Sequence, residues 1–97
     1  MALERREAFD NLSRHLKTIK ETVHKLDSEA EVYLFGSVAE GTHNYSSDID
    51  ILVITNVYPA KIHAELWEAG IKEPFEIHIH NRKEAEFFTR RASLKKI

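Results

Sequence analysis

The sequence predicts a small α/β domain of the α+β kind, in which helices pack on a mixed sheet. Apolar residues recur three and four positions apart through the first quarter of the chain, which is the spacing of one buried helical face. Further along, three short runs rich in β-branched and aromatic residues are separated by stretches of helical character. The expected order is therefore helix, strand, helix, strand, helix, strand, helix, which is typical of an α/β layout.

The first helix is expected to run from about Leu3 to Leu26. Its apolar stripe consists of Phe9, Leu12, Leu16, Ile19, Val23 and Leu26. At about 1.5 Å per residue this helix would be roughly 36 Å long, which is more than so small a domain needs. The run Glu31–Phe35 is rich in β-formers and ends at Gly36, so it predicts the first strand.

The middle of the chain predicts a central strand between two helical segments. A short helical turn is expected over Ser37–Gly41 and a polar loop over Thr42–Ser47. The continuous apolar run Ile49–Thr55 is typical of a strand that is covered on both faces. A helix should then begin at Pro59, because proline is favoured at the first helical position, and run to about Ala69, before the glycine at position 70.

The last third of the chain predicts one more strand and one more helix. Phe75–His80 alternates apolar and polar residues, as a half-exposed strand does. Asn81 can cap a final helix that runs to about Leu94. Four basic residues lie at or beyond the end of this helix, where cations offset the helix dipole or could contact an acidic partner: Arg90, Arg91, Lys95 and Lys96.

The bulk composition indicates one soluble globular domain, residues 1–97. The chain has 97 residues, of which 42% are hydrophobic and 31% are charged. No apolar run approaches the roughly 20 residues needed to span a membrane, and the charged N-terminus lacks the apolar region of a signal peptide. The chain has no cysteine, which excludes a disulfide framework and a thiolate metal site. A cytoplasmic location is the expectation.

The charge distribution argues against binding to nucleic acid through net charge. The net charge is −2, and residues 32–81 carry two lysines against seven acidic residues. An acidic centre of this kind repels phosphate groups unless cations lie in it. Bound divalent metal would make such a centre useful for phosphate chemistry.

In the most informative motif, ten residues separate the pair Gly36 and Ser37 from Asp48, Ile49 and Asp50. Gly36 lets the backbone turn sharply and lets a ligand approach the main chain. Ser37 begins a helical turn, whose free N–H groups and hydroxyl can hold phosphate oxygens. Asp48 and Asp50 are two residues apart at the head of a strand, so both side chains should project from the same face.

A third carboxylate is expected beside this pair. Glu76 lies on the polar face of Phe75–His80, opposite the apolar residues of that strand. Carboxylates so close together repel one another unless a cation lies between them, and oxygen ligands select Mg²⁺ or Mn²⁺. His78 and His80 share that strand face, but without cysteine they are more typical of solvated or neighbouring imidazoles than of a zinc site.

The segment Leu34–Ile54 resembles the signature of the DNA polymerase β nucleotidyltransferase superfamily, in which Gly-Ser precedes Asp-x-Asp. It is most similar to the minimal nucleotidyltransferases (MNT) found beside HEPN-domain proteins in prokaryotes. The resemblance implies that Gly36 and Ser37 hold a nucleoside triphosphate. It also implies that Asp48, Asp50 and Glu76 act with two Mg²⁺ ions, or Mn²⁺, in transferring a nucleoside monophosphate to a hydroxyl group.

The same resemblance implies ATP as donor and a HEPN-type helical partner as acceptor, with this chain as its antitoxin. A homodimer is the other assembly expected. The long first helix suggests a docking surface formed by Phe9 and Leu12, together with Trp67 or Phe88.

Two alternatives remain open from the sequence. Many members of the superfamily have arginine where this chain has Glu40, and that departure favours a catalytically degenerate module that only docks a partner. Transfer to a nucleic-acid end or to a small molecule is the second alternative. The absence of a basic stripe in the sequence disfavours it.

Overall fold

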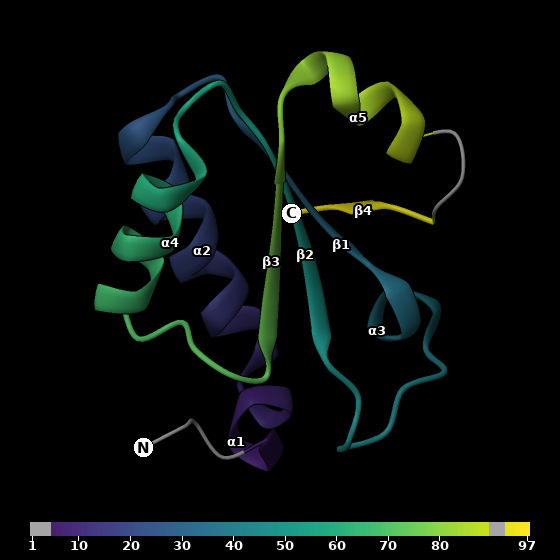
Figure 1. Cartoon of the computed structure of the whole chain (residues 1–97). Coiled ribbons are helices and arrows are strands. Elements are labelled where there is room, and N and C mark those ends of the chain that lie inside the picture. The colour runs from purple at the N-terminus through teal and green to yellow at the C-terminus, as the bar shows by residue number, and fades with distance from the viewer. Residues whose placement is uncertain (1–4, 90–92) are drawn as a thin grey trace.

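The structure, a computed structural model, describes residues 5–89 and 93–97 and consists of one mixed sheet with helices on both of its faces (Figure 1). The elements in chain order are α1 (Arg5–Asp10), α2 (Leu12–Leu26), β1 (Glu31–Phe35), α3 (Gly36–Glu40), β2 (Ile49–Ile54), α4 (Pro59–Glu68), β3 (Phe75–His80), α5 (Arg82–Thr89) and β4 (Lys95–Lys96). The predicted strands and the predicted helices in the middle of the chain are confirmed to within two residues.

The four strands lie in the order β3-β2-β1-β4. β1 pairs antiparallel with both β2 and β4, whereas β2 and β3 are parallel. The sheet is therefore mixed, as predicted. The register sets Phe35 of β1 opposite Asp50 of β2, and Asp50 opposite Glu76 of β3. Three strands thus bring the end of β1 and the beginnings of β2 and β3 to the same edge of the sheet.

The central strand β2 is buried on both faces, as its continuous apolar run predicts. On one face Ile49, Ile51 and Val53 belong to the main core, which α2 and α4 cover side by side. On the other face Leu52 and Ile54 pack with Ala85 of α5 in a smaller cluster. Because α5 covers only part of that second face, the polar residues at the start of β2 and β3 stay accessible.

The expectation of one continuous N-terminal helix is wrong, because the chain breaks at Asn11. Its backbone has φ −114° and ψ 29°, outside helical geometry, and its side-chain amide donates to the carbonyl oxygen (3.3 Å) and the carboxylate (3.1 Å) of Glu7. The break separates α1 from α2 and lets the fully buried Ala8 reach the core. Residue 3, where the helix was expected to start, lies outside the described residues.

The expected end of the last helix is also wrong. Asn81 caps α5 as predicted: it accepts a hydrogen bond from the Glu84 N–H (2.8 Å), and its own N–H donates to the Glu84 carboxylate (3.0 Å). The described part of α5 is Arg82–Thr89, and Leu94 lies outside any helix and packs against the smaller apolar cluster. The basic residues 90 and 91 lie outside the described residues.

The two C-terminal lysines form β4 instead of a helical end. Tyr33 of β1 lies opposite Lys96, and Leu34 lies opposite Lys95. The N–H of Ile97 donates to the Val32 carbonyl at 3.0 Å. The physical reason is that β1 would otherwise present an unpaired edge. In the part of the chain that the structure describes, no helix has the length and apolar character to cross a membrane.

Candidate active site at the strand edge

Gly36 forms the turn from β1 into α3 and lies directly against Asp50. Its φ of 74° is a left-handed conformation that side chains disfavour. A Cβ added to Gly36 would collide with the Asp50 carboxylate, and the Cγ of Asp50 would be only 3.3 Å away. Glycine is therefore required here for two separate reasons, and its backbone forms one wall of a carboxylate site.

Asp50 and Glu76 are direct neighbours on the parallel pair β2 and β3. The Asp50 side chain is 23% exposed, whereas that of Glu76 is 54% exposed, so the pair extends from the sheet surface toward solvent. The structure thus places Glu76 on the same face as Asp50, where the alternating pattern of Phe75–His80 predicts it.

His78 joins these two carboxylates. Its Nε2 lies 3.4 Å from Asp50 Oδ1 and 3.6 Å from Glu76 Oε1, and its ring packs edge-on against Phe35 at a centroid distance of 5.1 Å. Ligand atoms of Asp50, Glu76 and His78 all lie within 4.8 Å of one another. Sequence reasoning gave His78 only a neighbouring role, although its position two residues after Glu76 on one strand face was the available signal.

Asp48, which the sequence predicts on the same face as Asp50, is not part of this three-residue group and instead contacts Arg5 of α1. Arg5 Nη2 lies 3.3 Å from Asp48 Oδ1, while Nη1 donates to the carbonyl oxygens of Ser46 (3.2 Å) and Ser47 (2.9 Å). The guanidinium therefore fixes both the carboxylate and the loop that leads into β2. Nothing in the local sequence signals Arg5, because its contact depends on the break at Asn11.

Ser37 is the second residue of α3 and so lies in its first turn. The N–H groups in the first turn of a helix have no partner within the helix and can donate to an anion. The short helix closes at Gly41, which has φ 76°, and the Thr42 N–H then donates to the Ser37 carbonyl at 3.0 Å. The turn is thereby fixed beside the carboxylates.

The donor set fits a divalent cation. Carboxylate oxygens are common ligands of both Mg²⁺ and Mn²⁺, whereas an imidazole nitrogen suits transition-metal ions such as Mn²⁺ better than Mg²⁺. The arrangement can therefore hold a cation next to a turn with free N–H groups. This is a combination suited to binding and activating a phosphate ester.

Comparison with known proteins leads to the same kind of chemistry. The family model described as "Nucleotidyltransferase domain" matches residues 16–97. A crystal structure described as that of a "putative nucleotidyltransferase" is 32% identical in sequence, with a TM-score of 0.65, over 86% of this chain and 97% of that chain.

A second structure, described in the same words and from Sulfolobus solfataricus, is 26% identical with a TM-score of 0.53 over 90% of this chain and 84% of that chain. A search among curated proteins finds no significant match. The sheet and its helices match a polymerase β-like nucleotidyltransferase fold. With its family match spanning α2 to the last residue, this chain belongs to the nucleotidyltransferase domain family.

Proposed function

We propose that this chain is a metal-dependent nucleotidyltransferase that transfers a nucleoside monophosphate, AMP from ATP, to a hydroxyl group. The observation that supports it most is the gathering of Asp50, Glu76 and His78 within 4.8 Å of one another, with the Gly36 backbone against Asp50. A carboxylate cluster beside a helical turn places cation ligands next to N–H groups that can donate hydrogen bonds to phosphate.

Asp50, Glu76 and His78 would hold the first divalent ion, and Asp48 is the remaining carboxylate of the motif for a second. Mg²⁺ is the ion that the resemblance of Leu34–Ile54 implies, and Mn²⁺ is the alternative that the imidazole of His78 favours. When bound, such ions supply Lewis-acid stabilisation of charge on the phosphoryl oxygens. Asp48 would first have to exchange its contact with Arg5, which is an exposed ion pair of low strength.

The protein's own groups would bind the donor and position the acceptor. The N–H groups at Gly36 and Ser37 would donate to the triphosphate, and the carboxylate of Glu76 would take the proton of the acceptor hydroxyl. The acceptor oxygen would then form a bond to the α-phosphorus while the bond to pyrophosphate breaks. Most of the protein's contribution would be orientation of the two reactants.

The proposed acceptor is a hydroxyl of a HEPN-type helical protein or of a second copy of this chain. The resemblance of Leu34–Ile54 to minimal nucleotidyltransferases supports this assignment. An antitoxin role and a cytoplasmic location belong to the same proposal. Three large side chains are exposed and offer contact area for a helical partner: Tyr58 and Trp67 at α4 on one face of the sheet, and Phe87 of α5 on the other. The side chain of Phe88, a sequence-based candidate for this surface, lies outside the described residues.

A docking module without catalysis is the second candidate function. Glu40 in place of the usual arginine favours it, and so does the pairing of Asp48 with Arg5. Glu40 puts a negative charge where a triphosphate favours a cation, and the ion pair occupies Asp48 with Arg5 instead of a metal ion.

The deciding experiment uses ATP labelled at the α-phosphate, ATP labelled at the γ-phosphate, Mg²⁺ or Mn²⁺, and as acceptor the protein encoded by the neighbouring gene. We expect metal-dependent incorporation of label into that protein from α-labelled ATP and none from γ-labelled ATP. The Asp50→Asn variant serves as the inactive control. ATP binding or complex formation without label transfer would support the docking module instead.

A further inference from the structure

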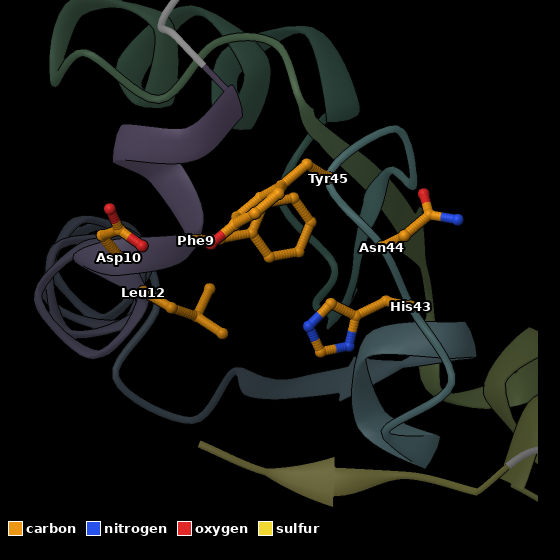
Figure 2. Close-up of a pocket in the computed structure, with 6 residues that line it drawn as sticks. All are labelled: Phe9, Asp10, Leu12, His43, Asn44 and Tyr45. Carbon is orange, nitrogen blue, oxygen red and sulfur yellow. The ribbon is translucent and has the colours of Figure 1, made fainter.

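A cavity of about 390 Å³ lies between the junction of α1 with α2 and the loop over residues 42–47 (Figure 2). Its walls are formed by Phe9, Asp10, Leu12, His43, Asn44 and Tyr45. The sequence predicts that Phe9 and Leu12 contribute to a docking surface. Both side chains are partly buried against the main core and also line this cavity.

Three rings give the cavity an aromatic wall. Phe9 and His43 are stacked, with ring planes 6° apart and centroids 5.1 Å apart. Tyr45 meets Phe9 edge-on at a centroid distance of 5.7 Å. Tyr45 nevertheless remains 54% exposed, so part of its ring is available to a ligand. Aromatic faces and edges of this kind bind flat π-systems by stacking and edge contacts.

Both walls of the cavity are linked to Asp48, the carboxylate of the motif that contacts Arg5. On the loop side, Tyr45 precedes Asp48 by three residues, a separation that the chain can span over at most about 10 Å. On the helix side, Phe9 and Arg5 are four residues apart on α1 and therefore lie on one helical face. Arg5 in turn contacts Asp48. A ligand whose phosphates lie at a metal ion on Asp48 would thus have its other end near this cavity.

We propose that this cavity binds the base of the donor nucleotide, an inference that rests on the proposed function. The rings suit a planar base, and the carboxylate of Asp10 at the rim disfavours a phosphate. Figure 2 shows the Asn44 side chain pointing away from the rings, and its Oδ1 accepts a hydrogen bond from the Ser46 N–H at 2.9 Å. Recognition therefore occurs by stacking, which favours the larger purines over pyrimidines and discriminates weakly between adenine and guanine.

The test compares ligands with and without a base on matched variants. Binding of ATP, CTP and inorganic tripolyphosphate is measured by calorimetry in the presence of Mn²⁺. Tyr45→Ala removes a ring that is largely exposed, and Tyr45→Phe retains the ring without the hydroxyl. A melting curve of each variant verifies that it is folded.

Tyr45→Ala is expected to weaken ATP binding about tenfold, on the scale of one lost base–aromatic stack, and to leave tripolyphosphate binding unchanged. Tyr45→Phe should bind ATP as the natural protein does. The natural protein should bind ATP several times more tightly than CTP, and Tyr45→Ala should lose that preference.

Two results overturn the inference while the proposed function stands. In one, Tyr45→Ala binds ATP as tightly as the natural protein; in the other, it weakens ATP and tripolyphosphate by the same factor. A different result, in which the natural protein binds neither ATP nor tripolyphosphate with metal, overturns the proposed function, and the base site is then rejected with it.

Discussion

At the residue scale, Gly36 is subject to two constraints, its left-handed backbone and its close approach to Asp50, and comparison with Gly41 separates them. Gly36→Ala imposes a left-handed conformation on alanine and also drives its Cβ into the Asp50 carboxylate. Gly41→Ala imposes the same kind of backbone cost at φ 76°, but nothing lies within 4 Å of its Cβ.

We expect Gly41→Ala to lower the free energy of unfolding by about 1 kcal/mol and Gly36→Ala by at least about 2 kcal/mol. We also expect only Gly36→Ala to lose metal-dependent ATP binding. Urea denaturation and calorimetry measure the two quantities. Equal effects of the two substitutions would mean that Asp50 does not constrain position 36.

Asp50 and Glu76 should oppose each other in the metal-free protein, because like charges on neighbouring strands are unfavourable. Asp50→Asn keeps the side-chain shape and removes one of these charges. We therefore expect transfer activity to fall by about a hundredfold or more, while the melting temperature stays unchanged or rises slightly. Glu65→Gln, an exposed change on α4, is the control that should alter neither. A large drop in the melting temperature of Asp50→Asn would give this carboxylate a structural role.

The motif and the strand alternation were sufficient to predict where Gly36, Asp50 and Glu76 lie. They could not rank His78, because histidine on a half-exposed strand face is common and the sequence does not give the distance across the sheet. That distance follows from the parallel register of β2 and β3, which sets Asp50 beside Glu76, one pleat from His78.

At the element scale, the connection after α2 is held by hydrogen bonds to the Asp27 carboxylate, and their contribution to stability depends on pH. The Thr55 hydroxyl donates to Asp27 Oδ2 at 2.6 Å, and the Glu29 N–H donates to Oδ1 at 3.0 Å. These hydrogen bonds, that of Thr55 first, lower the pKa of Asp27. A lowered pKa stabilises the fold above the ordinary pKa of an aspartate, about 3.9, and this contribution disappears as pH falls through the folded-state pKa.

Asp27→Asn should therefore be less stable than the natural protein at pH 7, by no more than about 1 kcal/mol because the carboxylate is partly solvated. At about pH 3 the difference should shrink. Urea denaturation at both pH values checks this, with Glu29→Gln as the matched control. Glu31, whose pKa is also lowered, by the Tyr33 hydroxyl above all, is present in both proteins and cancels in the comparison. A difference that stays constant with pH would contradict the assignment.

The sequence did not predict the break between α1 and α2 or the strand β4, and both result from tertiary packing. The apolar spacing continues through Asn11, so periodicity alone favours one helix, and only the burial of Ala8 shows why the chain turns there. β4 has two lysines and no β-forming pattern, so it exists because β1 offers it an unpaired edge. The capping asparagine at position 81, by contrast, acts within four residues and could be predicted from the sequence.

At the scale of the whole molecule, the break at Asn11 decides which residues surround the site. α1 lies below the lower end of the sheet in Figure 1, and Arg5 contacts a loop more than 40 residues away in sequence. Arg6, the next residue, points elsewhere: its side chain is 79% exposed and pairs with Asp10 of its own helix at 4.0 Å. These neighbours therefore form a matched pair for testing whether the contact between α1 and the site loop matters.

We expect Arg5→Gln to have two effects that Arg6→Gln lacks. First, backbone hydrogen exchange should quicken over residues 42–48, because the loop loses its two contacts with the Arg5 Nη1. Second, Mn²⁺ should bind a few times more tightly at low salt, because Asp48 is released and a nearby positive charge is removed. Added salt should reduce this second difference, since the ion pair is exposed. If Arg5→Gln matches Arg6→Gln in both exchange and Mn²⁺ affinity, α1 has no part in setting the site, and the family-matched residues 16–97 form it without help from Arg5.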